Sequence, residues 1–131
     1  MSKAYLALSF AGKERLQPVV DTIRKVLADA GVELFVFVEQ YLFSPGEAKA
    51  MMQQAFTCIR DCDLLIAEVS EKAIGVGIEI GYAAALLKPI IYIRHENAGH
   101  STTCSGSADH TITYGNTAEL EDKLGKLVCS L

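Results

Sequence analysis

Short apolar runs of strand length alternate with helix-like segments along the whole chain. Five runs are rich in β-branched and aromatic residues, at 3–10, 32–38, 63–69, 90–93 and 110–114. Strands that are separated by helices pair in parallel, because a parallel connection needs a crossover of a dozen or more residues. This alternation predicts an α/β fold in which helices cover both faces of one sheet.

The segments between these runs carry helix signals. Apolar residues recur at helical spacing over 13–30, and Gly31 ends that segment. The sequence Ser44-Pro45-Gly46-Glu47 combines a capping box with a proline at the first helical position and predicts a helix to about Arg60. Two further helices are predicted at 77–87, which Lys88-Pro89 ends, and at 116–129.

These elements predict one domain over residues 1–131. It is a doubly wound, flavodoxin-like or Rossmann-like sheet of five parallel strands in the order 2-1-3-4-5, because right-handed crossovers leave few topologies. Residues 94–108 form a long polar loop, and loops of this length are often functional.

Composition excludes several classes of function. Half of the residues are hydrophobic and 21% are charged, which indicates buried strands or surface hidden in an oligomer. No apolar run could span a membrane or form a secretory signal, and a net charge of −4 without basic patches argues against a nucleic-acid polymer as partner. The four cysteines and three histidines lack metal-ligand spacing, so we expect no metal, no cofactor and a cytoplasmic protein with reduced thiols.

Glu79 is the main functional candidate. It follows Gly75-Val76-Gly77, where a predicted buried strand passes into a helix. Ligands of open parallel sheets bind beyond the carboxyl ends of the strands, where a carboxylate can serve as a nucleophile or base. The alternative is that Glu79 only complements the dipole at the start of the helix.

Two motifs resemble the nucleoside 2-deoxyribosyltransferase family, whose smaller members include the 2'-deoxynucleoside 5'-monophosphate N-hydrolases. Residues 63–70 read DLLIAEVS and residues 75–83 read GVGIEIGYA. Tyr5, Ser9 and the loop at 101–103 extend the resemblance over most of the chain. The resemblance implies that Glu79 attacks the anomeric carbon of the sugar and forms a covalent glycosyl ester. Tyr5 would hold and polarise Glu79, although it is also an ordinary aromatic residue of a strand.

The resemblance also implies a site for the 5' end of the substrate at the turn after the first strand. Ser9, Phe10, Gly12 and Lys13 would bind a 5'-phosphate or a 5'-hydroxyl there. A serine at this place is equally an ordinary helix-start residue.

Other substrate contacts are expected further along the chain. Glu68, at the end of the third strand, would bind sugar hydroxyls or support Glu79, and Gly75 and Gly77 would let the backbone approach the ligand. The resemblance further suggests that Ser101 and Thr103 reach a neighbouring subunit's site, which implies a homodimer or a higher homo-oligomer. From the sequence alone, Glu68 is also an exposed acid at a strand end and the 101–103 segment is also a solvated turn.

The chain departs from the family pattern at two places. The family has an aspartate that serves the departing base on the helix before the third strand, but residues 53–57 read QQAFT, so Asp61, Glu47 and Glu39 are the alternative acids. In the turn after the first strand, Leu8 stands where the family frequently has a glycine. Ala11 stands where the hydrolases can have an arginine for the phosphate, and Lys13 or Arg15 could take the place of that arginine.

The sequence therefore predicts an enzyme that cleaves the N-glycosidic bond of a 2'-deoxynucleoside or its 5'-monophosphate. Hydrolysis is favoured over transfer to a second base, because a short chain leaves little room for a second base pocket. The alternatives are a nucleotide-binding or sensing module without catalysis, and an interaction domain with no small-molecule role.

Overall fold

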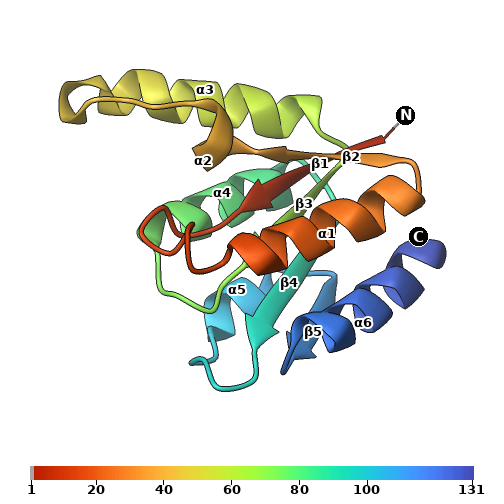
Figure 1. The fold of residues 1–131 in the computed structure, drawn as a ribbon. Helices are drawn as coiled ribbons and strands as arrows, with labels where there is room; N and C mark the ends of the chain where they lie inside the picture. Colours follow the sequence, from red (N-terminus) through yellow and green to blue (C-terminus); the bar gives the residue numbers. More distant parts are fainter. Residues whose placement is uncertain (1) are drawn as a thin grey trace.

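The computed structural model describes residues 2–131 as a five-stranded sheet wrapped by helices (Figure 1). All neighbouring strands are parallel, and their order is β2-β1-β3-β4-β5. The strands are β1 (Ser2–Ala7), β2 (Val32–Val36), β3 (Leu64–Glu68), β4 (Ile90–His95) and β5 (His110–Tyr114). The predicted fold class and strand order are confirmed.

Helices cover both faces of the sheet. The α-helices are α1 (Gln17–Asp29), α2 (Phe37–Gln40), α3 (Ala48–Asp61), α4 (Ile74–Ala85), α5 (Thr102–Gly106) and α6 (Thr117–Cys129), and the 3-10 turn η1 (Pro45–Glu47) precedes α3. Helices α1 and α6 lie side by side on one face, whereas α3, α4 and α5 lie on the other. Of the described helices, none is both long and apolar enough to cross a bilayer.

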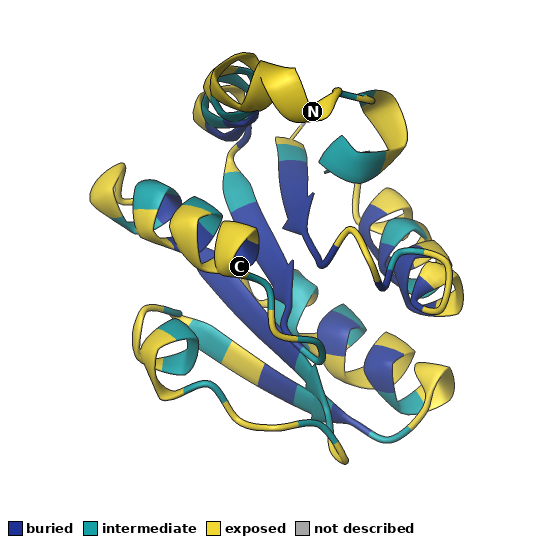
Figure 2. Cartoon of the chain, turned by 90° about the vertical axis from the view of Figure 1, so that its left-hand side faces the viewer, coloured by how far each residue is buried: buried dark blue, intermediate teal, exposed yellow. Residues whose placement is uncertain are grey.

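The hydrophobic core lies in two layers, one on each side of the sheet. Four of the five β3 residues are buried, which explains why this strand reads as a continuous apolar run (Figure 2). The stripe expected on α1 is also buried, and it consists of Val19, Val20, Ile23, Val26 and Leu27. All four cysteines are unpaired; Cys62 is buried and Cys129 is exposed.

Several predicted boundaries were wrong. The first helix begins at Gln17 rather than at residue 13, because residues 10–16 form turns ahead of Pro18. The second strand ends at Val36, and the residues expected to continue it form α2. The fourth helix begins at Ile74, so Gly75-Val76-Gly77 belongs to its first turns instead of preceding it. The 94–108 loop contains the short helix α5.

A buried carboxylate fixes the end of β3. Glu68 is 1% exposed and accepts hydrogen bonds from the Ser70 backbone N–H at 2.6 Å, the Ser70 hydroxyl at 2.9 Å and the Tyr114 hydroxyl at 2.6 Å. The Ser70 hydroxyl oxygen also accepts a bond from the His95 N–H at 2.8 Å. This network joins the ends of β3, β4 and β5 and sets the direction of the loop that leads to α4.

We expect Tyr114→Phe to lower the free energy of unfolding by about 1.5 to 3 kcal/mol, because it removes one donor from a buried charged acceptor. Urea unfolding would measure the loss. Tyr82→Phe is the matched control, since its hydroxyl contacts Arg60 near the surface, and it should cost less than about 1 kcal/mol. Equal losses in the two variants would contradict a structural role for the Glu68 network.

Candidate active site

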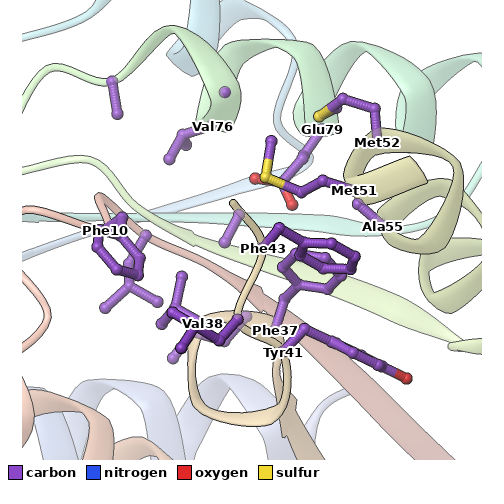
Figure 3. Close-up of a pocket in the computed structure, with 16 residues that line it drawn as sticks. Phe10, Phe37, Val38, Tyr41, Phe43, Met51, Met52, Ala55, Val76 and Glu79 are labelled. Atoms are coloured by element: carbon purple, nitrogen blue, oxygen red, sulfur yellow. The ribbon is translucent and has the colours of Figure 1, made fainter. Parts of the chain in front are cut away.

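A cavity of about 350 Å³ opens beside the ends of the central strands (Figure 3). It adjoins the boundary between β1 and β3, where the strand order reverses and open α/β sheets bind ligands. Its walls come from the end of β1, from α2 and the loop after it, from α3 and from the start of α4. The lining residues are Leu6, Ala7, Leu8, Phe10, Phe37, Val38, Tyr41, Leu42, Phe43, Met51, Met52, Ala55, Ala73, Gly75, Val76 and Glu79.

Glu79 is the one charged side chain among the described residues that line this cavity. It lies beyond the first turn of α4, which holds no acidic residue. The dipole effect falls off within the first turn, so helix capping does not account for Glu79. The side chain is half-buried and is presented to the cavity by α4.

Tyr5 and Glu79 are in direct contact. Tyr5 is fully buried in β1, its ring packs against Phe35 and Phe37, and its hydroxyl donates a hydrogen bond to Oε2 of Glu79. The structure therefore brings together the two residues for which the sequence predicts catalytic roles.

Burial sets the protonation of this pair. It raises the pKa of Glu79 from an ordinary 4.5 to about 7, although the hydrogen bond from Tyr5 acts in the opposite direction. Burial, and then the negative charge of Glu79, raise the pKa of Tyr5 well above its ordinary value. Tyr5 thus remains a donor at neutral pH, while Glu79 changes its charge near pH 7.

One end of the cavity is an apolar wall that the sequence did not reveal as part of the site. The rings of Phe37, Tyr41 and Phe43 have centroids 5.0 to 6.1 Å apart, and Met51 and Met52 of α3 also line the cavity (Figure 3). The sequence feature that could have indicated this wall is the high number of aromatic residues within 35–43. Aromatic and thioether groups of this kind suit a flat heteroaromatic ring.

The opposite end of the cavity borders the turn between β1 and α1, where the 5' end was predicted to bind. Phe10 lines the cavity, and the Lys13 ammonium lies 4.6 Å from the centre of its ring. Ser9 is buried and its hydroxyl donates to Glu71 at 3.2 Å. The predicted turn residues are gathered here, but they are accompanied by a carboxylate that the sequence analysis missed.

Several other predicted residues lie outside the lining. The carboxylate of Glu68 is buried among its three donors, and Gly77 is exposed on α4. Ser101 caps α5 by accepting a bond from the Cys104 N–H, and Thr103 is exposed on the same helix. A role for Ser101 and Thr103 in this site would require a second subunit.

The alternative acids for the departing base are also engaged elsewhere. Glu39 pairs with Arg24 at 2.5 Å, Glu47 bonds Ser44 in the capping box, and Asp61 is exposed at the end of α3. Of residues 53–57, among which the resemblance would place the acid, Ala55 lines the cavity. Within residues 2–131, no cluster of three or more histidine, cysteine, aspartate or glutamate residues could hold a metal ion.

Comparison with known proteins gives relatives that act on nucleotides. The 5-hydroxymethyl-dUMP N-hydrolase of Rattus norvegicus is 36% identical over 66 residues, which are 49% of this chain and 40% of that protein. The Branchiostoma floridae protein of the same name is 34% identical over 71 residues, which are 53% of this chain and 68% of that protein. Matches to bacterial, rat and mouse relatives span 28% to 40% of those proteins' own lengths.

A solved structure supports the same relationship over nearly the whole fold. The Clostridium botulinum CMP N-glycosidase is 26% identical, with a TM-score of 0.66 over 94% of this chain and 98% of that chain. The model of the family described as nucleoside 2-deoxyribosyltransferase matches residues 4–123. The chain therefore belongs to the nucleoside 2-deoxyribosyltransferase family.

Proposed function

We propose that this protein cleaves the N-glycosidic bond of a 2'-deoxynucleoside or of its 5'-monophosphate. The observation that carries the proposal is the Tyr5–Glu79 pair, which places one carboxylate with a raised pKa on the wall of an otherwise uncharged cavity. A perturbed carboxylate in a cleft is typical of a functional site. The named activities of the relatives concern the same bond.

In the first step, an oxygen of Glu79 attacks C1' of the sugar while the C1'–N bond breaks and its electron pair leaves with the base. The product is a glycosyl ester on Glu79. In the second step, water attacks C1', its proton passes to solvent, and Glu79 is released as a carboxylate. Two steps of this kind suit an oxocarbenium-like transition state, which a nearby negative charge stabilises. Tyr5 holds the carboxylate in line for attack.

The apolar wall opposite Glu79 would receive the base, and no acid lies beside it. The base must then leave without a proton from the protein, so its own acidity would control the rate. The cavity is near the lower size limit of ligand pockets. We therefore favour hydrolysis over transfer to a second base.

The alternative is a nucleotide-binding or sensing module that has the same cavity but no turnover. This alternative is favoured by the alanine at position 55, because the cavity wall then has no acidic side chain there that could protonate a departing base. A nucleotide that raises the melting temperature without being cleaved would support this alternative.

The exposed face of α4 supports the predicted homodimer. Ile74 is 86% exposed and Ile78 is 47% exposed, one helical turn apart and close to the cavity residues Gly75 and Val76. Exposed apolar groups that are clustered in this way are typical of an interface. We propose that a second copy covers this face and that its Ser101 and Thr103 approach the site.

Incubation with a panel of deoxynucleosides and their 5'-monophosphates should release free base, as measured by chromatography. Glu79→Gln should reduce the rate by about a thousandfold or more, because the amide is a poor nucleophile. Release should be faster from 5-fluoro-2'-deoxyuridine than from 2'-deoxyuridine, because the fluorinated base is the better leaving group. Silence across the panel, or full activity in Glu79→Gln, would refute the proposed function.

The pH profile of kcat/KM should have an acid limb with a pKa near 7, because Glu79 must be ionised to attack. Below pH 7 the value should fall about tenfold per pH unit. Tyr5→Phe should move the limb to higher pH, since the bond from Tyr5 lowers the pKa of Glu79. Tyr41→Phe is the control, because its hydroxyl bonds Gln54 instead, and it should leave the limb in place.

Light scattering should report a dimer, and Ile78→Glu should shift it towards monomer with lower activity, because the added charge must be desolvated in the interface. Leu131→Glu is the control, since this exposed residue lies beside Ala84 at the C-terminal end of α4, whereas Ile74 is at the start of the helix. A wild-type monomer that turns over substrate would contradict the shared site.

A further inference from the structure

The carboxylate of Glu71 lies within the turn where the 5' end of a substrate was predicted to bind. The Ser9 hydroxyl donates to Glu71 at 3.2 Å and the Arg15 guanidinium pairs with it at 2.5 Å. A Cβ added to Gly12 would lie 2.6 Å from Oε2 of Glu71, so the carboxylate rests directly against the turn backbone. The Glu71 carboxylate is thus held against this turn by the Ser9 hydroxyl, the Arg15 guanidinium and the lack of a side chain at Gly12.

The polar groups that could bind a phosphate at this end of the cavity are already in contact with other groups. Glu71 is half-buried and neutralises Arg15, while Lys13 is held over the Phe10 ring. Among the described residues that line the cavity, there is no lysine or arginine, and Glu79 adds a second carboxylate. A phosphate group carries a charge of about −1.5 to −2 at neutral pH and normally requires cationic or multiple N–H donors.

The two ends of the cavity determine how a nucleoside would lie in it. With C1' against Glu79, the base extends from C1' and the 5' substituent extends from the opposite side of the sugar ring. The wall of Phe37, Tyr41 and Phe43 would receive the base, so the 5' substituent would point towards Phe10 (Figure 3). Ala73 also lines the cavity. Ala73 follows Glu71 by two residues in the loop from β3 to α4.

We propose that Glu71 is a specificity-determining residue that selects a free 5'-hydroxyl and rejects a 5'-phosphate. This inference rests on the proposed function and assigns its substrate class as 2'-deoxynucleosides. A hydroxyl can donate a hydrogen bond to the Glu71 carboxylate, whereas a phosphate would meet a like charge and a cation that is already paired. The substrate named for the rat relative is a monophosphate, so this chain would differ from it in selectivity.

The test compares kcat/KM for 2'-deoxyuridine and for its 5'-monophosphate, which share base and sugar. The wild-type protein should prefer the nucleoside by about tenfold or more. In Glu71→Gln, the ratio should move by about tenfold towards the monophosphate, because the amide has no charge and Arg15 becomes available. Adding Arg15→Met to that variant should remove the gain.

Glu14→Gln is the matched control. This substitution also removes one negative charge, here from the turn between β1 and α1. Because the Glu14 side chain is exposed and does not lie against Gly12, the ratio of kcat/KM for the two substrates should stay unchanged. A wild-type preference for the monophosphate, or equal shifts in Glu14→Gln and Glu71→Gln, would overturn the assignment of Glu71 while base release still supports the proposed function. Absence of release from both substrates and from the wider panel would reject the proposed function itself.

Isothermal titration of the Glu79→Gln protein gives a second measurement that does not depend on turnover. It should bind 2'-deoxyuridine more tightly than its monophosphate, and the added Glu71→Gln change should narrow or reverse the difference. Tighter binding of the monophosphate to the Glu79→Gln protein would contradict the inference.

Discussion

The hydrogen bond between Tyr5 and Glu79 is the contact on which the site depends. It joins β1, in the middle of the sheet, to α4, and so fixes the carboxylate relative to the cavity. Tyr5 can do this because its ring is fully buried against Phe35 and Phe37. The same burial that locks the tyrosine also desolvates the glutamate and raises its pKa to about 7. The packing at this end of the sheet therefore both fixes the position of Glu79 and raises its pKa.

This arrangement has a cost in stability. A carboxyl group whose pKa rises from 4.5 to about 7 on folding favours the folded state while it is protonated, and that contribution is fully present below pH 4.5. It is lost as the pH rises through 7, because the ionised form is poorly solvated in the fold. Keeping Glu79 ionised at neutral pH, as the proposed reaction requires, therefore lowers the stability of the fold, which is common for functional sites. Glu68 at the end of β3 is more deeply buried than Glu79, and it accepts three hydrogen bonds.

The strand order and the strands themselves could be predicted, because a buried parallel strand must be apolar and a crossover must be right-handed. Local boundaries could not. Phe37 and Val38 have strand propensity, yet they form α2, because the aromatic side chains from Phe35 to Phe43 pack together in three dimensions. Gly75 and Gly77 read as a turn but lie in α4, with φ angles outside the left-handed region. Their lack of side chains leaves open space next to the cavity and on the exposed face of the helix.

The candidate site was predictable in part. Residues that belong to a recognisable motif could be found from the sequence, whereas residues that meet only through the folding of distant segments could not. Tyr5 and Glu79 were found through motif positions that the family resemblance connected. Glu71 was missed because its contacts with Ser9 and Gly12 join segments that are more than fifty residues apart in the sequence. The aromatic wall was missed because the secondary-structure propensity of residues 37–43 does not show which of their side chains line the same cavity as Glu79. Ala55 has a similar consequence: among the described residues that line the cavity, Glu79 is the one acidic side chain, so in the proposed reaction it would supply negative charge to an oxocarbenium-like transition state while no second acid would protonate the base. Under the proposed function, the rate of base release would therefore depend on how well the departing base carries its own negative charge.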